Sequence, residues 1–196
     1  MQGKTNLAAY NNHHYHPGAG WLKRTLWFYV SALIFKTSLF PSSSFKVFLL
    51  RLFGAKLGQG LVLRHRLNIK YPWFLVVGDY SWIGEGVWID NLVPVKIGAN
   101  VCLSQGVMLQ TGNHDFSKQN FDLITGEIVL ENGVWIGAKA IVCPNVCAEE
   151  HAVLTAGSIA SKNLEAYFVY QGNPAVKVKK REIKVHDFIP IKEVWS

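Results

Sequence analysis

The sequence predicts a mainly β fold in which short strands wind into a solenoid around an inner column of aliphatic side chains. Two observations predict it: aliphatic residues recur at every sixth position from residue 57 onward, and glycine often follows them directly. The repeat positions are Leu57, Leu63, Ile69, Leu75, Val77, Ile83, Ile89, Val95, Ile97, Leu103, Leu109, Leu130, Ile136, Val142, Ala148, Leu154 and Ala160. A period of six fits neither a helix nor a simple alternating strand, and long internal repeats are typical of solenoids.

Each six-residue unit reads as a short β-segment followed by a tight turn. Units such as IGEGVW, IGANVC and IGAKAI place a glycine where the turn needs a small residue. Three units would close one coil, and stacked coils would bury a column that no single repeat buries alone. The spacing slips by two residues at 75–77 and at 95–97, where we expect small bulges at corners. The β-helix is predicted to span residues 56–165.

The chain ahead of Lys56 lacks this repeat. The polar residues 1–20, which include HHYHPGAG, are expected to form a flexible N-terminus. Residues 21–55 are expected to form an apolar helical segment, in which Pro41 and the serines after it separate two helices. Basic residues interrupt its apolar run, so no membrane-spanning helix is expected. The two helices would either lie on a membrane surface or pack against the solenoid.

A loop that interrupts the repeat carries the candidate catalytic residue. The repeat stops after Leu109 and resumes near Ile128, which predicts a projecting loop at 110–129. The segment TGNHDF places His114 and Asp115 on it, and loops held by a rigid scaffold often carry function. A neutral imidazole can accept a proton near neutral pH, although a histidine beside an aspartate can equally be a solvated pair.

Charge and composition narrow the partners. The net charge of +7 favours an anionic partner, but the basic residues are dispersed or gather near the tail, so we expect no nucleic-acid partner. Residues 166–196 are expected to form a short C-terminal helix and tail. No metal requirement is expected, because His65, His114 and His151 lack the spacing of a zinc site and no thiol or carboxylate cluster accompanies them.

Several segments, taken in order, carry a resemblance to a known family. They are IGEGVW, IGANVC, TGNHDF, GVWIGAKAIVCPNV, TAGSIASK and QGNPAVKVKKR. Over residues 21–182 the sequence resembles the hexapeptide-repeat acyltransferases with a left-handed parallel β-helix, and among them the colanic acid biosynthesis acetyltransferases of the WcaF type. The resemblance implies acetyl-CoA-dependent O-acetylation of a sugar hydroxyl in exopolysaccharide biosynthesis. It also implies a cytoplasmic homotrimer, which we expect to associate peripherally with the inner membrane face.

The resemblance assigns roles to individual residues. His114 matches the family's catalytic histidine and would act as general base, while Asp115 would orient it, contact the sugar or cap the loop turn. Asp90 and Asn91 would offer hydrogen bonds to the acceptor sugar, or simply form a polar corner. The positions that match the acetyl-CoA site are Trp135, Ala138, Ala156, Ser161, Lys162, Asn173, Pro174, Lys180 and Arg181.

Other interpretations of the same residues stay open. Ala138 and Ala156 would let the pantetheine arm approach the backbone, or would be ordinary small turn residues. The basic run 177–181 would meet the nucleotide phosphates or remain solvated. A β-helix can also be a non-catalytic scaffold that binds polysaccharide or membrane-associated partners, since fold does not fix function. An amine could replace the hydroxyl as acceptor.

Overall fold

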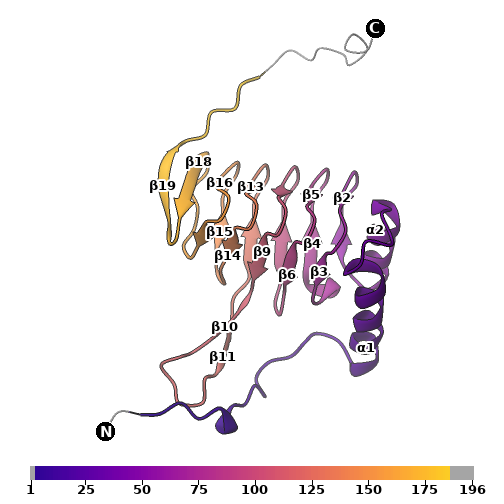
Figure 1. Cartoon of the computed structure of the whole chain (residues 1–196), viewed down its shortest axis with the longest axis vertical. Helices are drawn as coiled ribbons and strands as arrows, with labels where there is room; N and C mark the ends of the chain where they lie inside the picture. Colours follow the sequence, from indigo (N-terminus) through magenta and orange to yellow (C-terminus); the bar gives the residue numbers. More distant parts are fainter. Residues whose placement is uncertain (1–2, 186–196) are drawn as a thin grey trace.

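The computed structural model describes residues 3–185 and shows a parallel β-helix with two helices at one end and a hairpin projecting from its side (Figure 1). Three parallel sheets form its walls. Wall A contains β1 (Lys56–Leu57), β4 (Leu75–Val77), β7 (Val95–Ile97), β12 (Ile128–Leu130) and β15 (Cys147–Ala148). Wall B contains β2 (Val62–Leu63), β5 (Trp82–Ile83), β8 (Cys102–Leu103), β13 (Trp135–Ile136) and β16 (Val153–Leu154). Wall C contains β3 (Asn68–Ile69), β6 (Trp88–Asp90), β9 (Met108–Gln110), β14 (Ile141–Val142) and β17 (Ile159–Ala160).

The period of six puts one aliphatic side chain of each strand into the shared core. In wall B the parallel register stacks these side chains directly above one another, and each is at most 1% exposed. The stacked residues are Leu63, Ile83, Leu103, Ile136 and Leu154. Burying a side chain of this size contributes roughly 1.5–3 kcal/mol. The column therefore holds consecutive coils in one register, and the predicted fold class is confirmed.

At the two places where the spacing of six slips by two residues, the chain forms three-residue strands and not bulges at corners. Leu75 and Val77 are the two ends of β4, and both point into the core while Val76 faces outward. Val95 and Ile97 do the same in β7. The expectation of bulges was wrong because a three-residue strand alternates its side chains, which gives two inward positions two residues apart.

Close stacking of coils explains the glycines that follow the aliphatic positions. A Cβ added to Gly78 would lie 2.6 Å from the backbone nitrogen of Ala99 in the next coil. Corner residues also need a left-handed backbone, which Asn100 (φ 57°) and Asn145 (φ 65°) adopt. Asparagine tolerates this region better than most non-glycine residues, so the corners keep their shape where glycine is missing.

The N-terminal helices cover the open end of the first coil. They are α1 (Trp21–Val30), the π-helical turn η2 (Ser31–Phe35) and α2 (Ser43–Leu52), whose start is capped by the Ser42 hydroxyl. Trp27 is buried and donates a 2.9 Å hydrogen bond from Nε1 to the carbonyl of Ile69. Phe35 and Leu50 complete the contact with the core. The helices thus pack on the solenoid and leave their outer face exposed.

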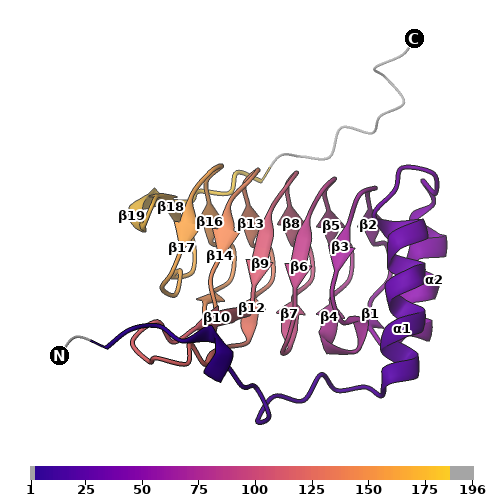
Figure 2. The ribbon, with the colours of Figure 1, turned by 60° about the horizontal axis from the view of Figure 1, so that its bottom comes forward.

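The N-terminal residues run away from the helices towards the hairpin (Figure 2). We expected a flexible terminus for residues 1–20, but residues 3–20, here named the N-terminal strap, make specific contacts and include the short helix η1 (Leu7–Ala9). The amide of Asn6 donates to the carbonyl of Gln119 at 2.8 Å, and the Tyr15 hydroxyl donates to the carbonyl of Leu92 at 2.9 Å. Both partners are distant in the sequence, which is why composition alone did not reveal the contacts.

The other end of the β-helix closes with a hairpin instead of the expected C-terminal helix. β18 (Phe168–Gly172) pairs with β16 and so extends wall B, and β19 (Ala175–Lys180) pairs antiparallel with β18. The segment is rich in valine and aromatic residues, which favour strands, and Asn173 and Pro174 form its turn. The predicted helix was therefore wrong for the described part of residues 166–196, and residues 186–196 lie outside it.

Candidate active site

The hairpin that carries His114 leaves the β-helix at the corner between wall C and wall A. It consists of β10 (Gly112–His114) and β11 (Leu123–Thr125), which pair antiparallel in the insertion between β9 and β12. Thr111 fixes its base, because its hydroxyl donates to the carbonyl of Asp90 at 2.8 Å and accepts from the amide of Leu92. His114 is thereby held at the end of a short strand beside the rigid scaffold.

The imidazole of His114 is oriented by a backbone carbonyl. Its Nδ1 lies 2.9 Å from the carbonyl oxygen of Phe121, and because a carbonyl only accepts, Nδ1 carries the proton and Nε2 has a free lone pair. The Phe121 ring stacks on the imidazole at 4.6 Å, and Tyr10 approaches it edge-on at 5.9 Å. Phe121 has a left-handed backbone (φ 55°), which is uncommon for a bulky residue and turns its carbonyl towards the ring.

Asp115 caps the loop turn and does not orient His114. Its carboxylate accepts hydrogen bonds from the amide and the hydroxyl of Ser117, and Lys118 lies 3.8 Å away. The hydrogen bond from the Ser117 side chain, helped by the Ser117 amide and by Lys118, lowers the pKa of the Asp115 carboxyl. Of the three roles considered for Asp115, the geometry matches the turn cap, and the orienting role belongs to the carbonyl of Phe121.

A hollow of about 430 Å³ opens beneath His114. Residues from three parts of the chain line it: the N-terminal strap, the corner after wall C and the hairpin. They include Tyr10, Asn12, Tyr15, Lys70, Tyr71, Asp90, Gln110, Asn113 and His114. Hydroxyl, amide, ammonium and carboxylate groups on an aromatic background are suited to a polyhydroxylated ligand that also presents an apolar ring face.

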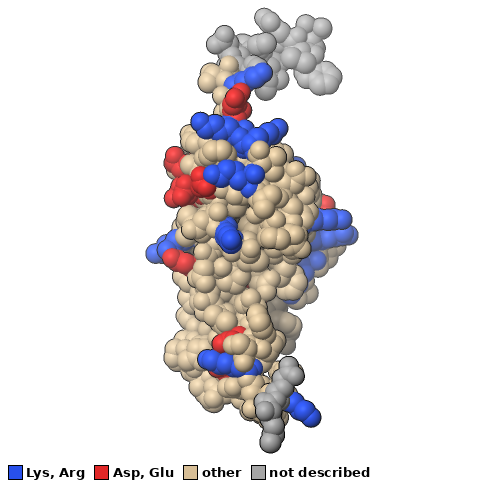
Figure 3. All heavy atoms as spheres, turned by 90° about the vertical axis from the view of Figure 1, so that its left-hand side faces the viewer, with Lys and Arg blue, Asp and Glu red and all other residues tan. Residues whose placement is uncertain are grey.

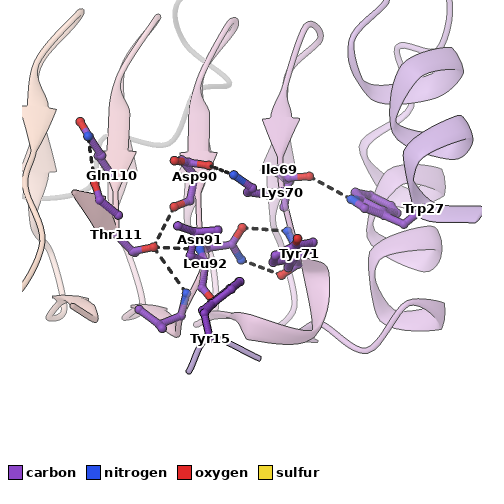
Figure 4. A network of polar contacts seen from close by, with 12 residues as sticks. Tyr15, Trp27, Ile69, Lys70, Tyr71, Asp90, Asn91, Leu92, Gln110 and Thr111 are labelled. Carbon is purple, nitrogen blue, oxygen red and sulfur yellow. Dashed lines mark hydrogen bonds and ion pairs between the residues drawn. The ribbon is translucent and has the colours of Figure 1, made fainter. Parts of the chain in front are cut away.

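Asp90 lines this hollow, whereas Asn91 does not. Figure 4 shows the polar contacts of both side chains. The Asp90 carboxylate pairs with Lys70 at 3.0 Å, and its side chain is 18% exposed, so it can still meet a ligand. Asn91 is fully buried, and its amide accepts from the backbone nitrogen of Tyr71 and donates to the carbonyl of Tyr71. The prediction that Asn91 binds the acceptor was therefore wrong, since its polar atoms are committed to joining neighbouring coils.

The residues predicted to bind acetyl-CoA occupy other parts of the β-helix. Trp135 lies on the outside of wall B, is 46% exposed and donates from Nε1 to the Ser104 hydroxyl at 3.0 Å. Ala138 and Ala156 sit in consecutive coils at the corner between walls B and C, where the amide of Gly157 donates to the Ala138 carbonyl at 2.8 Å. These small residues line a corner of stacked backbone, which is different from the corner that carries His114.

The remaining predicted donor residues cluster towards the β18–β19 end. Ser161 and Lys162 are exposed directly after β17, and Asn173 and Pro174 form the exposed hairpin turn. Figure 3 shows basic side chains gathered over this end with acidic ones beside them. Lys180 is exposed on β19.

Arg181 holds the end of the fold together. Its Nη1 donates to the carbonyls of Gly133 (2.8 Å) and His151 (3.0 Å), which ties the chain after β19 to the corner between walls A and B. Both hydrogen bonds use Nη1 of the guanidinium group, so Arg181 helps to close this end of the fold. Binding of the cofactor by Arg181 stays a prediction.

The histidines do not assemble into a metal site. Within residues 3–185, no three histidine, cysteine, aspartate or glutamate side chains converge as possible ligands. His65 pairs with Glu85 at 3.1 Å, and His151 packs against Tyr167. Each of these histidines therefore has a local partner.

Comparison with known proteins places the chain in a family. No protein-family model matches it. The chain is 39% identical over 164 residues to an Escherichia coli protein assigned by name to colanic acid biosynthesis as the acetyltransferase WcaF, with 84% of this chain and 90% of that protein covered. This chain is a member of the WcaF-type acetyltransferases. A second relative, the galactoside O-acetyltransferase of Escherichia coli, is 31% identical over 136 residues and covers 68% of this WcaF-type chain and 66% of its own length.

A solved structure supports the fold of this WcaF-type chain. The hexapeptide-repeat acetyltransferase of Vibrio cholerae, solved in complex with acetyl-CoA, superposes with a TM-score of 0.77 at 19% sequence identity. The match covers 89% of this chain and 97% of the other. At 19% sequence identity, this structural similarity establishes only that the chain folds as a β-helix.

Several residues around His114 were not predicted from the WcaF-type sequence. Lys70 lies one coil before Asp90 in wall C, and counting the register from one coil to the next could have found the pair. Tyr15 and Phe121 carry no such signal, because the first reaches the site through the strap and the second acts through its backbone.

Proposed function

We propose that this WcaF-type acetyltransferase moves the acetyl group of acetyl-CoA to a sugar hydroxyl of an exopolysaccharide precursor, with His114 as general base. The observation that carries the proposal is the hydrogen bond from His114 Nδ1 to the Phe121 carbonyl, which leaves Nε2 ready to accept a proton beside a polar hollow. The names of the colanic acid and galactoside relatives support a saccharide acceptor. The acetyl-CoA complex of the Vibrio cholerae relative supports the donor.

In the proposed reaction, Nε2 of His114 takes the proton of the acceptor hydroxyl while the hydroxyl oxygen attacks the thioester carbonyl carbon. The carbon–sulfur bond then breaks, and the imidazolium returns the proton to the leaving thiolate, so that the products are an acetyl ester and coenzyme A. The Phe121 carbonyl stabilises the transient imidazolium by accepting from Nδ1 throughout. Asp90 and Lys70 would fix the sugar through hydrogen bonds to its hydroxyl groups.

The decisive experiment measures thiol release from acetyl-CoA with a panel of free, nucleotide-linked and lipid-linked sugars. Wild-type turnover should require a sugar, and His114→Ala should lower kcat/KM by roughly 10²–10⁴-fold without unfolding the protein. A His114→Ala protein that keeps the wild-type rate, or thiol release that needs no sugar, would contradict the proposal. His151→Ala is a matched control, since His151 packs against Tyr167 at the corner between walls A and B and does not line the hollow.

The proposed active site includes residues from two copies of the chain. The small residues Ala138 and Ala156 lie at the corner between walls B and C, whereas His114 projects from the corner between walls C and A. One chain therefore does not bring the donor residues onto its own imidazole. Cyclic association of three chains would place the hairpin of one copy beside the donor corner of its neighbour.

The proposed location is the cytoplasm, at the inner membrane face. No helix within residues 3–185 is both long and apolar enough to cross a bilayer. The outer face of α1 nevertheless exposes Leu22, Leu26, Tyr29 and, one turn further in η2, Leu33. No Asp or Glu precedes Asp79 in the sequence, so basic residues alone set the charge of this end of the chain. An apolar face with basic surroundings fits an anionic membrane surface.

A further inference from the structure

Two hollows meet beside Asp90. The first is the hollow beneath His114, and the second, of about 380 Å³, lies between α1 and wall C. Lys70, Tyr71 and Asp90 line both of them, so the two hollows adjoin along these three residues. A sugar placed beneath His114 would leave the second hollow for another part of the same acceptor.

The second hollow has uncompensated positive charge. Its lining contains Arg24, Lys36 and Lys70 but only one acidic residue, Asp90. Asp90 is already paired with Lys70 at 3.0 Å. Neither Arg24 nor Lys36 forms an ion pair with an acidic side chain among residues 3–185, and the sequence ahead of Asp79 contains no acidic residue. Two such side chains favour an anionic ligand.

Arg24 and Trp27 of α1 both line the second hollow. Trp27 is anchored by its hydrogen bond to Ile69, which fixes the part of α1 that faces wall C. Burial raises the pKa of Tyr15 well above its usual range, Tyr71 and Asp90 add to the rise, and Arg24 opposes it. The opposing effect is consistent with a guanidinium close to Tyr15, which itself lines the first hollow.

We propose that the acceptor carries a phosphate or diphosphate next to the reacting sugar, and that Arg24 and Lys36 bind this group in the second hollow. This inference rests on the proposed function, and it names the chemical class of the acceptor as a sugar phosphate or diphosphate whose other end is a nucleoside or a lipid. Guanidinium and ammonium groups form charge-assisted hydrogen bonds to phosphate oxygens, and these are stronger than the neutral hydrogen bonds that a free sugar would make.

The first test is calorimetric titration of the full-length protein with inorganic pyrophosphate in saturating coenzyme A, which occupies the donor site. The wild type should bind pyrophosphate, and the Arg24→Ala/Lys36→Ala double variant should bind it at least about tenfold more weakly. Lys56→Ala is the matched control, because Lys56 is an exposed cation of the same basic region that lines neither hollow. Absence of binding to the wild type, or equal affinity in the double variant, would overturn the inference.

The second test separates the two sources of the phosphate. Uridine diphosphate and farnesyl diphosphate in lipid vesicles compete with bound pyrophosphate on the same protein, and we expect one of them to displace it in an Arg24-dependent manner. Displacement by the nucleotide points to a nucleotide-linked acceptor, and displacement by the lipid points to a lipid-linked one. Displacement by neither would refute a phosphate subsite in the second hollow. These binding measurements need no turnover, so they fail or succeed independently of the thiol-release assay.

Discussion

At the scale of single residues, the proposed role of His114 as general base depends on where its Nδ1 proton is held. A backbone carbonyl holds it here, and that carbonyl is placed by the left-handed conformation of Phe121. No side-chain substitution removes a carbonyl, so the orientation of the imidazole depends on the shape of the loop. We therefore expect residues that stabilise the loop, such as Asp115, to affect the proposed reaction only through geometry.

Asp115→Ala tests this distinction. We expect kcat/KM to fall by less than about tenfold, far less than in His114→Ala, because the carboxylate bonds to Ser117 and not to the imidazole. A loss as large as that of His114→Ala would show that Asp115 belongs to the catalytic machinery. Ser117→Ala is the matched control, because it removes one donor to the carboxylate and should give a similar small loss.

The same carboxyl predicts a pH dependence of the loop. Its pKa is lowered in the folded protein, chiefly by the hydrogen bond from the Ser117 side chain. The stabilisation of the turn is therefore present above the pKa of an unfolded aspartate, about 4, and is lost as the pH falls through the lower folded value. The protection factors of the amides of residues 115–122, obtained by dividing the intrinsic exchange rate at each pH by the measured rate, should fall in acid in the wild type, and the Asp115→Ala loop should lack this acid-dependent change.

At the scale of elements, the N-terminal strap is the part of the chain that completes the hollow. It supplies Tyr10, Asn12 and Tyr15 to the lining, yet none of its residues belongs to the buried core. Deleting residues 3–16 should therefore lower kcat/KM for the acceptor by roughly tenfold or more, while the thermal unfolding midpoint changes little. Parallel kinetics and calorimetry measure both quantities. A large loss of stability, or unchanged kinetics, would contradict a positioning role for the strap.

The outer face of α1 makes a separate prediction about membranes. Leu26→Ser/Leu33→Ser should weaken flotation with anionic vesicles by about tenfold or more, since each leucine buried in the interface contributes roughly 1.5–3 kcal/mol. Val178→Ser, an equally exposed aliphatic position on β19, is the control and should float like the wild type. Point variants are preferable to truncation of residues 1–53, because Trp27 and Phe35 belong to the core. Equal flotation of all variants would argue against a membrane-facing helix.

Elements that follow a local repeat were predictable, and elements defined by distant partners were not. The period of six identifies the inward positions of walls A, B and C, since burial selects the side chain at each one. Residues 168–180 lack that period, and the prediction for residues 166–196 was a short C-terminal helix and tail, although Val169, Tyr170 and Val176 favour strands. β18 forms there because β16 offers a free edge for pairing. The local sequence of residues 168–172 does not indicate this distant partner.

At the scale of the whole molecule, an active site shared between copies has a direct test. His114→Ala lacks the base, and Ala156→Trp should block the donor corner, so each homo-oligomer alone should be nearly inactive. Mixing the two variants under conditions that exchange subunits should restore a fraction of wild-type turnover, because some interfaces then pair an intact hairpin with an intact corner. No recovery despite exchange, measured by mass spectrometry, would mean that each chain forms a complete site by itself.

The site itself was only partly predictable, and the reason lies in how coils stack. Asp90 reaches the hollow together with Lys70 and Gln110, which come from the coils directly before and after it in wall C. The strand register along the β-helix therefore predicts this part of the site. The contributions of Tyr15 and Phe121 come from the strap and from a backbone carbonyl, and neither leaves a pattern in the sequence.

The course of the strap has a practical consequence for handling the protein. Its first described residues lie against the loop of the hairpin, through the contact between Asn6 and Gln119 (Figure 2). A purification tag or fluorescent fusion placed ahead of the strap would therefore emerge beside the hairpin that carries His114, and we expect it to lower activity for steric reasons. Assays of this enzyme are better made with the tag at the opposite terminus, or after the N-terminal tag has been removed.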